Sequence, residues 1–322
     1  MLLSVVFSFR NEQEVLSELI DRLYKTLDPL NIDYELIFVN DASADGSLEI
    51  LLNFHRKDNR IKIINMSRTF GVTPCVMAGL RHAKGDAVVY MDSDLQDPPE
   101  IISTLVEKFK EGADVINTTR TKRRGENVFK MWLIKQAYRV INSVSDIDIP
   151  QNTGDFKLLS RRAVNQLIQL NEYDPFMRGL VRWVGFKQVQ VFYERDVRFA
   201  GETKFSLLRS MNPIKEFIRG LVSFSELPLY FALVLGFLVS VGAFLYLLGI
   251  IFTRVFLGIH NPGWPAIMVT MLFFGGTILF TIGVLGLYIG KIHHEIKKRP
   301  PYIIESKIGI DENPSHNQGK NS

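Results

Sequence analysis

Two long runs without a charged residue, at 227–253 and 264–290, constrain the fold of this chain more than any other feature. Each run is long enough to cross the hydrocarbon core of a bilayer, which is about 30 Å thick, at roughly 1.5 Å of rise per residue. As buried helices of a soluble protein, both runs would need apolar surroundings on every face. The sequence therefore predicts two transmembrane helices.

The segment between the two runs, residues 257–263, is short, so we expect a helical hairpin whose outer ends lie on one side of the membrane. Basic residues flank these ends: Lys204, Arg209, Lys215 and Arg219 before the first run, and Lys291, Lys297, Lys298 and Arg299 after the second. Positively charged flanks favour the cytoplasmic side. Residues 1–7 lack the charged region that opens a signal peptide and are typical of a strand. Both termini are therefore expected in the cytoplasm.

Residues 1–204 alternate apolar runs with amphipathic segments, as in a soluble α/β domain. Predicted strands at 3–9, 34–39, 61–66, 87–91 and 113–118 alternate with helices that begin near residues 15, 47, 72 and 101. This alternation is typical of a mainly parallel sheet with right-handed crossovers. Such sheets bind ligands outside the carboxyl ends of their strands. Polar clusters begin at those ends, at Asn11, Asn40, Ser67 and Asp92.

An acidic cluster at residues 92–100 directly follows the strand at 87–91. In an extended backbone Asp92 and Asp94 project to the same side, and the Gln96 carbonyl follows in the same alternation. Oxygen donors placed in this way can hold Mg²⁺ or Mn²⁺ beside a substrate phosphate. The structural alternative is an acidic loop in which Asp97 or a neighbour caps the helix that starts near Pro98.

Two absent motifs and one acidic loop limit the kind of nucleotide site. The chain has no Gly-x-Gly-x-x-Gly after the first strand and no Walker A sequence, which disfavours dinucleotide-binding enzymes and P-loop ATPases. Residues 41–46 are acidic, so they suit hydrogen bonds to a base or ribose better than a phosphate cradle. Within this loop we interpret Ser43 and Asp45 as turn and helix-cap residues.

Cysteine usage and the basic residues indicate the compartment and the partners. The single cysteine, Cys75, excludes an internal disulfide and fits a reducing compartment. The net charge of +4 is modest, but cations are interleaved with apolar residues at 120–139 and 205–226, as in segments that lie in a membrane interface. Lipid is therefore the expected partner, and nucleic acid is not. Arg120, at the end of the fifth strand, suits an acceptor phosphate, with a surface ion pair as the alternative.

The order of these motifs resembles one enzyme family. Asn11-Glu12, residues 40–47, residues 67–71 and residues 92–100 look like the motifs of inverting GT-A glycosyltransferases, which have a Rossmann-like α/β domain with a mainly parallel sheet. More narrowly, the chain resembles the polyprenyl-phosphate glycosyltransferases. This group contains dolichyl-phosphate mannose synthase and the bacterial enzymes that load glucose onto undecaprenyl phosphate. The resemblance extends through residues 152–162 and the two C-terminal spans.

The resemblance implies roles for the matched positions. Nucleotide-sugar binding falls to Ser8, Glu12, Asp41, Arg68 and Asp92. Binding of the acceptor and the diphosphate falls to Arg120, Arg124, Lys130, Arg198 and Lys204. The metal ligands would be Asp92, Asp94 and Gln96, and the catalytic residues Asp155, Asp92 and Asp94. Because a phosphate monoester is already largely ionised at neutral pH, we expect Asp155 to position acceptor or metal as much as to remove a proton.

The expected architecture is a cytoplasmic GT-A domain at 1–204, a juxtamembrane amphipathic helix at 205–226, the hairpin within 227–291 and a cytoplasmic tail at 292–322. The resemblance implies an enzyme of the bacterial inner (plasma) membrane that would use Mg²⁺ or Mn²⁺ to move a hexose onto polyprenyl (undecaprenyl) phosphate with inversion. Glucose from UDP-glucose is the expected donor. A homo-oligomer, a homotetramer by analogy, is expected.

Two alternatives to this function stay open. A processive polysaccharide synthase shares the GT-A domain, but that family has more membrane spans and a Gln-x-x-Arg-Trp motif, and here Gly179 replaces the glutamine. A non-catalytic membrane scaffold could retain the fold. Such a scaffold would not need Asp92, Asp94, Arg120 and Asp155 together.

Overall fold

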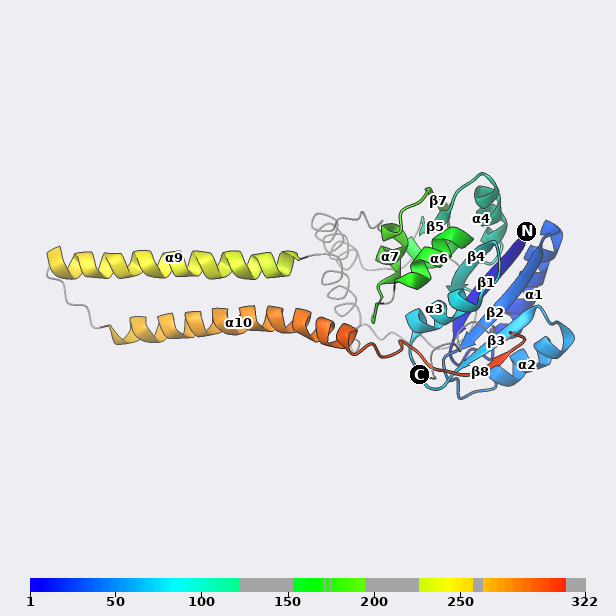
Figure 1. Cartoon of the computed structure of the whole chain (residues 1–322), viewed down its shortest axis with the longest axis horizontal. Helices are drawn as coiled ribbons and strands as arrows, with labels where there is room; N and C mark the ends of the chain where they lie inside the picture. The colour runs from blue at the N-terminus through cyan, green and yellow to red at the C-terminus, as the bar shows by residue number, and fades with distance from the viewer. Residues whose placement is uncertain (122–152, 171, 174, 195–225, 257–262, 311–322) are drawn as a thin grey trace, which may run out of the picture. The chain divides into compact units, whose positions relative to one another are not determined.

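The computed structural model describes residues 1–121, 153–170, 172–173, 175–194, 226–256 and 263–310 (Figure 1). The chain divides into two units. The first is built on a β-sheet and includes the segment that begins at Pro300, and the second contains the two long C-terminal helices. The predicted amphipathic helix at 205–226 lies outside the described residues, except for its last residue.

A mixed, mainly parallel sheet forms the centre of the first unit. Its eight described strands lie in the order β7-β5-β6-β4-β1-β2-β3-β8. In chain order they are β1 (Leu2–Phe9), β2 (Asp33–Asn40), β3 (Ile61–Met66), β4 (Ala87–Asp92), β5 (Val115–Arg120), β6 (Thr153–Ser160), β7 (Gln188–Tyr193) and β8 (Ile304–Ile308). Neighbours β4, β1, β2 and β3 run parallel, as do β5 and β7, whereas β6 and β8 are antiparallel to their neighbours. The predicted mainly parallel sheet is confirmed.

Helices cover both faces of this sheet, which explains why the central strands are apolar throughout. On one face lie α1 (Leu16–Leu27), α2 (Ser47–Lys57) and α4 (Ile101–Lys110), and on the other α3 (Val72–His82), α6 (Arg161–Gln169) and α7 (Met177–Trp183) (Figure 1). A short 3-10 helix, Asp28–Leu30, follows α1. The first face holds the main core, in which the Phe7 and Phe38 rings stack with centroids 4.9 Å apart.

Two helices show how sequence determines this packing. Apolar residues of α1 recur at helical spacing and are buried: Leu16, Leu19, Ile20, Leu23 and Leu27. On the opposite face α3 approaches the sheet so closely that a Cβ on Gly79 would lie 2.2 Å from Val6 Cγ1. Only glycine permits this approach, so Gly79 sets the distance between α3 and the sheet.

The five strands and four helices predicted for the first part of the chain are confirmed. Strands β6 and β7 and helices α6 and α7 were not predicted from the sequence, and residues 292–322 were predicted to form a tail. Instead, β8 pairs antiparallel with β3 at the edge of the sheet. Asn65 Nδ2 donates to Ser306 Oγ at 2.9 Å, and the Ser67 amide donates to the Ile303 carbonyl at 3.0 Å.

Among the described residues, the second unit is made mainly of α9 (Leu227–Phe256) and α10 (Trp264–Ile296), which contact each other through the edge-to-face pair of Phe231 and Phe280. Within them, Leu227–Phe252 and Ile267–Ile296 are long and apolar enough to cross a membrane, with mean hydropathies of 2.5 and 2.1. Most of their large apolar side chains are exposed in the chain by itself. These properties fit the two predicted spans.

Candidate active site

The predicted site residues that the structure describes gather at one edge of the sheet. Strands β1 to β5 and β7 all run in one direction, so their carboxyl ends share this edge, and antiparallel β6 begins there. Ser8, Glu12, Asp41, Arg68, Asp92, Asp94, Gln96, Arg120 and Asp155 all lie at or just beyond these ends. Arg124, Lys130, Arg198 and Lys204 lie outside the described residues.

The loops that follow β1 and β2 interlock through side chains. The Asn11 amide donates to Ser43 Oγ at 3.0 Å, and Asn11 Oδ1 accepts from the Ala44 amide at 2.8 Å. Asp45 accepts from the amides of Gln13 and Ser47, at 3.2 and 3.1 Å. The turn role predicted for Asp45 is confirmed by its contact with the Ser47 amide, whereas Ser43 Oγ accepts from the distant Asn11 amide and α2 has no side-chain cap. This interlock holds buried Glu12 at the edge, because its amide donates to Ser47 Oγ at 3.0 Å.

Asp41 organises the loop that follows β3. Its buried carboxylate accepts from the amides of Phe70 and Gly71, at 2.6 and 3.0 Å. In the same loop the Arg68 guanidinium lies over the Phe70 ring, 4.0 Å from the centroid. Asp41 therefore determines where Arg68 lies, which links two of the residues predicted to bind the nucleotide sugar.

Ser8 and Asp92 are register neighbours on the parallel strands β1 and β4. The Ser8 hydroxyl is buried and has no hydrogen-bond partner among the described residues. Burial, reinforced by the negative charges of Asp155, Asp94 and Asp97, raises the pKa of Asp92 to about 7. An unpaired buried donor next to a carboxylate with unfavourable charged neighbours is the kind of environment that a bound ligand satisfies.

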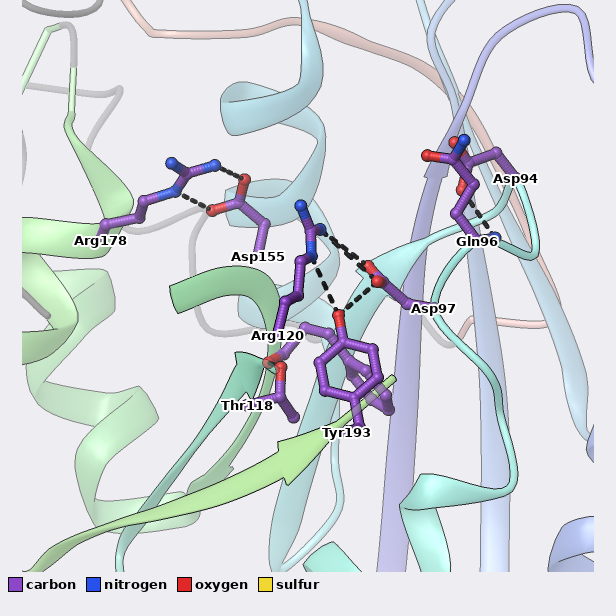
Figure 2. Close-up of polar contacts among 9 residues, drawn as sticks. Asp94, Gln96, Asp97, Thr118, Arg120, Asp155, Arg178 and Tyr193 are labelled. Atoms are coloured by element: carbon purple, nitrogen blue, oxygen red, sulfur yellow. Dashed lines mark hydrogen bonds and ion pairs between the residues drawn. The ribbon is translucent and has the colours of Figure 1, made fainter. Parts of the chain in front are cut away.

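The backbone beyond Asp92 differs from the extended chain that the sequence predicted. Strand β4 ends at Asp92, residues 93–97 bend, and Leu95 adopts a left-handed conformation with φ 56°. Asp94 Oδ1 accepts from the Gln96 amide at 3.1 Å, so these two residues belong to a turn (Figure 2). The extended backbone predicted for residues 93–96 was therefore wrong, although the turn still places Asp94 and Gln96 next to each other.

Arg120, Asp97 and Tyr193 form a buried polar cluster. Arg120 Nη2 lies 3.3 Å from Asp97 Oδ2, Arg120 Nε donates to the Tyr193 hydroxyl at 3.1 Å, and that hydroxyl donates to Asp97 (Figure 2). The Arg120 and Asp97 side chains are 13% and 1% exposed, so the surface ion-pair alternative for Arg120 was wrong. Asp97 binds Arg120 and Tyr193, and no side chain caps the N-terminus of α4. The alternative in which Asp97 or a neighbour caps this helix is therefore not observed.

Asp155 is held by Arg178, a site residue that was not predicted from the sequence. Arg178 Nε and Nη2 donate to the two Asp155 oxygens at 3.0 and 2.7 Å (Figure 2). Burial opposes the charged carboxylate, yet Arg178, with Lys157 and Arg120, lowers the pKa of Asp155. Asp155 is thus an ionised, oriented group and a weak base. No local pattern distinguished Arg178, because its partner Asp155 lies 23 residues earlier in the chain, on β6.

Comparison with known proteins identifies the family of this site. The family model for glycosyl transferase family 2 matches residues 4–168, which include the sheet edge from Ser8 to Asp155. The chain belongs to glycosyl transferase family 2. It is therefore a glycosyltransferase, its α/β domain has the predicted GT-A fold, and the scaffold alternative loses its support.

Relatives within this family match along nearly the whole chain. The uncharacterized glycosyltransferase YkcC of Bacillus subtilis is 44% identical over 96% of this chain and 94% of that protein. The prophage bactoprenol glucosyl transferase homolog of Escherichia coli K12 is 37% identical over 95% of this chain and 99% of that protein. The bactoprenol glucosyl transferase of Shigella phage SfII is 37% identical over 95% and 98%. The predicted resemblance to bacterial undecaprenyl-phosphate glucosyltransferases is confirmed.

Proposed function

We propose that this glycosyltransferase moves a hexose from a nucleotide sugar to polyprenyl phosphate at the cytoplasmic face of a bacterial plasma membrane. Glucose from UDP-glucose is the donor we expect first. Two kinds of observation support the proposal. Relatives named bactoprenol glucosyl transferase match over nearly all of this chain. The chain also carries two helices that are long and apolar enough to cross a membrane, where a lipid acceptor would be found.

The observation that carries the proposal is the division of the sheet edge into two parts. Beyond β1, β2 and β3 lie the interlocked loops and Asp41, which suit a nucleoside. Beyond β5 and β6 lie Arg120 and the Asp155–Arg178 pair, which suit a phosphate monoester. Asp92 ends β4, between these two parts. A donor and an acceptor bound side by side would meet there.

The donor set at this position fits a hard divalent cation. Among the described residues no three His, Cys, Asp or Glu side chains are grouped for a metal, so the protein would supply the Asp92 and Asp94 carboxylates and the Gln96 amide oxygen. The Asp92 carboxylate accepts no hydrogen bond from the described residues, and Asp94 Oδ2 is likewise available for a ligand. Mg²⁺ binds well through one or two carboxylates plus substrate phosphates. When bound, the ion would neutralise charge on the departing diphosphate.

In the proposed reaction an oxygen of the acceptor phosphate attacks the anomeric carbon from the face opposite the nucleotide. The new carbon–oxygen bond forms as the bond to the diphosphate breaks, so configuration inverts. Arg120 would orient the acceptor phosphate. Asp155, fixed by two hydrogen bonds to Arg178, would orient the acceptor rather than remove a proton, because its pKa is lowered and the phosphate is already ionised.

The test is transfer by the purified full chain, in detergent or proteoliposomes with Mg²⁺ or Mn²⁺, from a panel of radiolabelled UDP- and GDP-sugars to undecaprenyl phosphate. We expect a lipid-extractable product that contains one sugar and depends on both the donor and the acceptor. A polymer would indicate the processive synthase alternative. The absence of any lipid product from every donor would contradict the proposal. The same protein, cross-linked in lipid, would test the expected homotetramer.

A further inference from the structure

A fully buried lysine, Lys157, lies on β6 beneath the site and has no part in the proposed reaction. Its side chain is 1% exposed. Lys157 and Asp155 are two residues apart on the same strand, so both project from the same face of the sheet. Burying an ammonium is costly unless the group is hydrogen bonded. The arrangement around Lys157 is therefore expected to serve a purpose.

The ammonium begins a chain of hydrogen bonds that crosses three strands. Lys157 Nζ donates to Asn117 Oδ1 on β5 at 3.0 Å, and Asn117 Nδ2 donates to Gln188 Oε1 on β7 at 3.1 Å. Gln188 Nε2 then donates to carbonyls in and just beyond the last turn of α7, those of Val181, Arg182 and Gly185, at 3.1, 3.3 and 2.9 Å. The chain thus joins β6 to the helix that carries Arg178.

The chemistry of the ammonium sets the orientation of the Asn117 amide, and the two ends of the chain impose the same direction of hydrogen bonds. An ammonium can only donate, so Asn117 must turn its oxygen toward Lys157 and its amino group toward Gln188. Gln188 turns its oxygen toward Asn117, where it also accepts from Arg182 Nη1 of α7 at 3.1 Å, and its amino group toward the carbonyls of α7. Reversing either amide would place two acceptors against each other in a buried site.

We propose that Lys157 is a positioning residue for the Asp155–Arg178 pair, because its ammonium orients the Asn117 amide, which through Gln188 ties β6 to the C-terminal end of α7. Its effect on Asp155 and Arg178 is twofold. The anchored helix holds Arg178 in place for its two hydrogen bonds, and the buried positive charge favours the ionised form of Asp155. The effect on the anchored helix does not depend on which sugar or acceptor the enzyme uses.

Three variants separate this role from a general contribution to folding. Lys157→Met keeps the length of the side chain and removes the donor. Lys157→Arg keeps a donor-only cation. Asn117→Asp is nearly isosteric and leaves the ammonium paired, but its carboxylate cannot donate to Gln188, so it breaks the chain one step further on. Lys62→Met is the matched control, because Lys62 is a partly buried lysine on β3 that pairs with Glu35 outside the site.

The first measurement is hydrogen–deuterium exchange of the full chain in detergent micelles. We expect Lys157→Met and Asn117→Asp to speed exchange in α7 about tenfold while α1 and α4 keep their rates, and Lys157→Arg and Lys62→Met to leave α7 unchanged. If Lys157→Met does not fold, Asn117→Asp supplies the comparison. Unchanged exchange in α7, or equal acceleration in α1 and α4, would overturn the proposal.

The second measurement, which rests on the proposed function, is steady-state transfer. Misplacing Arg178 should lower kcat about tenfold in Lys157→Met and Asn117→Asp, while the KM for the nucleotide sugar changes less than about twofold. A residue that only stabilises the fold would lower the amount of active enzyme and leave kcat per folded molecule intact, a result that would also overturn the proposal. If the unmodified enzyme transfers no sugar at all, the proposed function fails, and the exchange experiment still decides the role of Lys157.

Discussion

Gly154 lies so close to Arg120 that a Cβ in place of its hydrogen would be 3.2 Å from Arg120 Nη2 and 3.5 Å from Cζ. The guanidinium thus rests against bare backbone of β6 while it binds Asp97 and Tyr193. A side chain at this position would push the guanidinium by a few tenths of an ångström, and the buried Asp97 leaves it little room to move.

Gly154→Ala is therefore expected to lower transfer about tenfold, through loss of acceptor positioning, and to change the free energy of unfolding by less than about 1.5 kcal/mol. Steady-state kinetics and urea unfolding would measure the two effects. Gly249→Ala, at a position on α9 with no atom within 4 Å of an added Cβ, is the control. Full activity of Gly154→Ala would mean that Arg120 does not need its observed position.

Replacing Arg178 should affect catalysis more than stability. Arg178→Lys keeps the charge but cannot make the two parallel hydrogen bonds to Asp155, so we expect kcat to fall about tenfold; Arg178→Met should lose more. Both side chains are about one-third exposed, so the pair should contribute only about 1 kcal/mol to folding. Because the pKa of Asp155 is lowered in the folded protein, that contribution is present above about pH 4 and fades below it. A stability difference that persists in acid would contradict this assignment.

Asp155→Asn tests whether this carboxylate orients the acceptor or removes a proton. We expect kcat to fall about a hundredfold, with little change in the KM for the nucleotide sugar and no change in the shape of the pH profile, because a carboxylate of lowered pKa is ionised throughout the working range. Loss of one limb of the pH profile would indicate a general base. Near-normal turnover at high pH with retained acceptor affinity would exclude an essential role.

Removal of divalent cations with EDTA should abolish transfer, and Mg²⁺ or Mn²⁺ should restore it. In Asp94→Asn the concentration of metal needed for half-maximal rate should rise about tenfold or more, because Asp94 Oδ1 already accepts from the Gln96 amide and Oδ2 is the oxygen left for a metal. Asp58→Asn, just before β3 at the opposite edge of the sheet, should leave the metal requirement unchanged. Full activity in EDTA would contradict the proposed metal role.

Lys157 should make folding stability depend on pH in the alkaline range. Burial lowers its pKa from 10.5 to about 8, while Asp155 opposes this shift and Arg178 and Arg182 add to it. Between these two values the unfolded chain binds more protons than the folded one, so stability rises with pH. Relative to Lys157→Met, the unmodified protein should gain up to about 3 kcal/mol between pH 8 and 10.5. A constant difference across this range would show that Lys157 stays charged.

The elements that sequence predicted well are those whose local pattern is unambiguous. The strands from β1 to β5 are apolar, β-branched runs, and α1 carries its apolar residues at helical spacing. The pattern of β6 was obscured because Asp155 and Lys157 are charged at positions that face a covered side of the sheet. Strand β8 is a short edge strand with Glu305 and Lys307, so its local pattern is weak.

The contacts between site residues could not be predicted from the sequence, for a different reason. Arg120 donates a hydrogen bond to Tyr193 because the pairing of β5 with β7 places these two residues in register, although they are far apart in the chain. Arg178 reaches Asp155 because α7 packs over β6. Residue types at strand ends could be predicted from local pattern, but their partners depend on which strands become neighbours, and no local pattern specifies that.

Strand β8 also determines the order in which the catalytic sheet can be completed. It pairs with β3, yet the ribosome makes it only after both long helices. Until then the outer edge of β3 has no partner from β8 and offers its backbone amides and carbonyls to any other extended chain. A gene truncated before α9 would leave this edge open permanently. A soluble form of the enzyme would therefore need residues 300–310 fused back to the catalytic domain as well as removal of the two apolar helices.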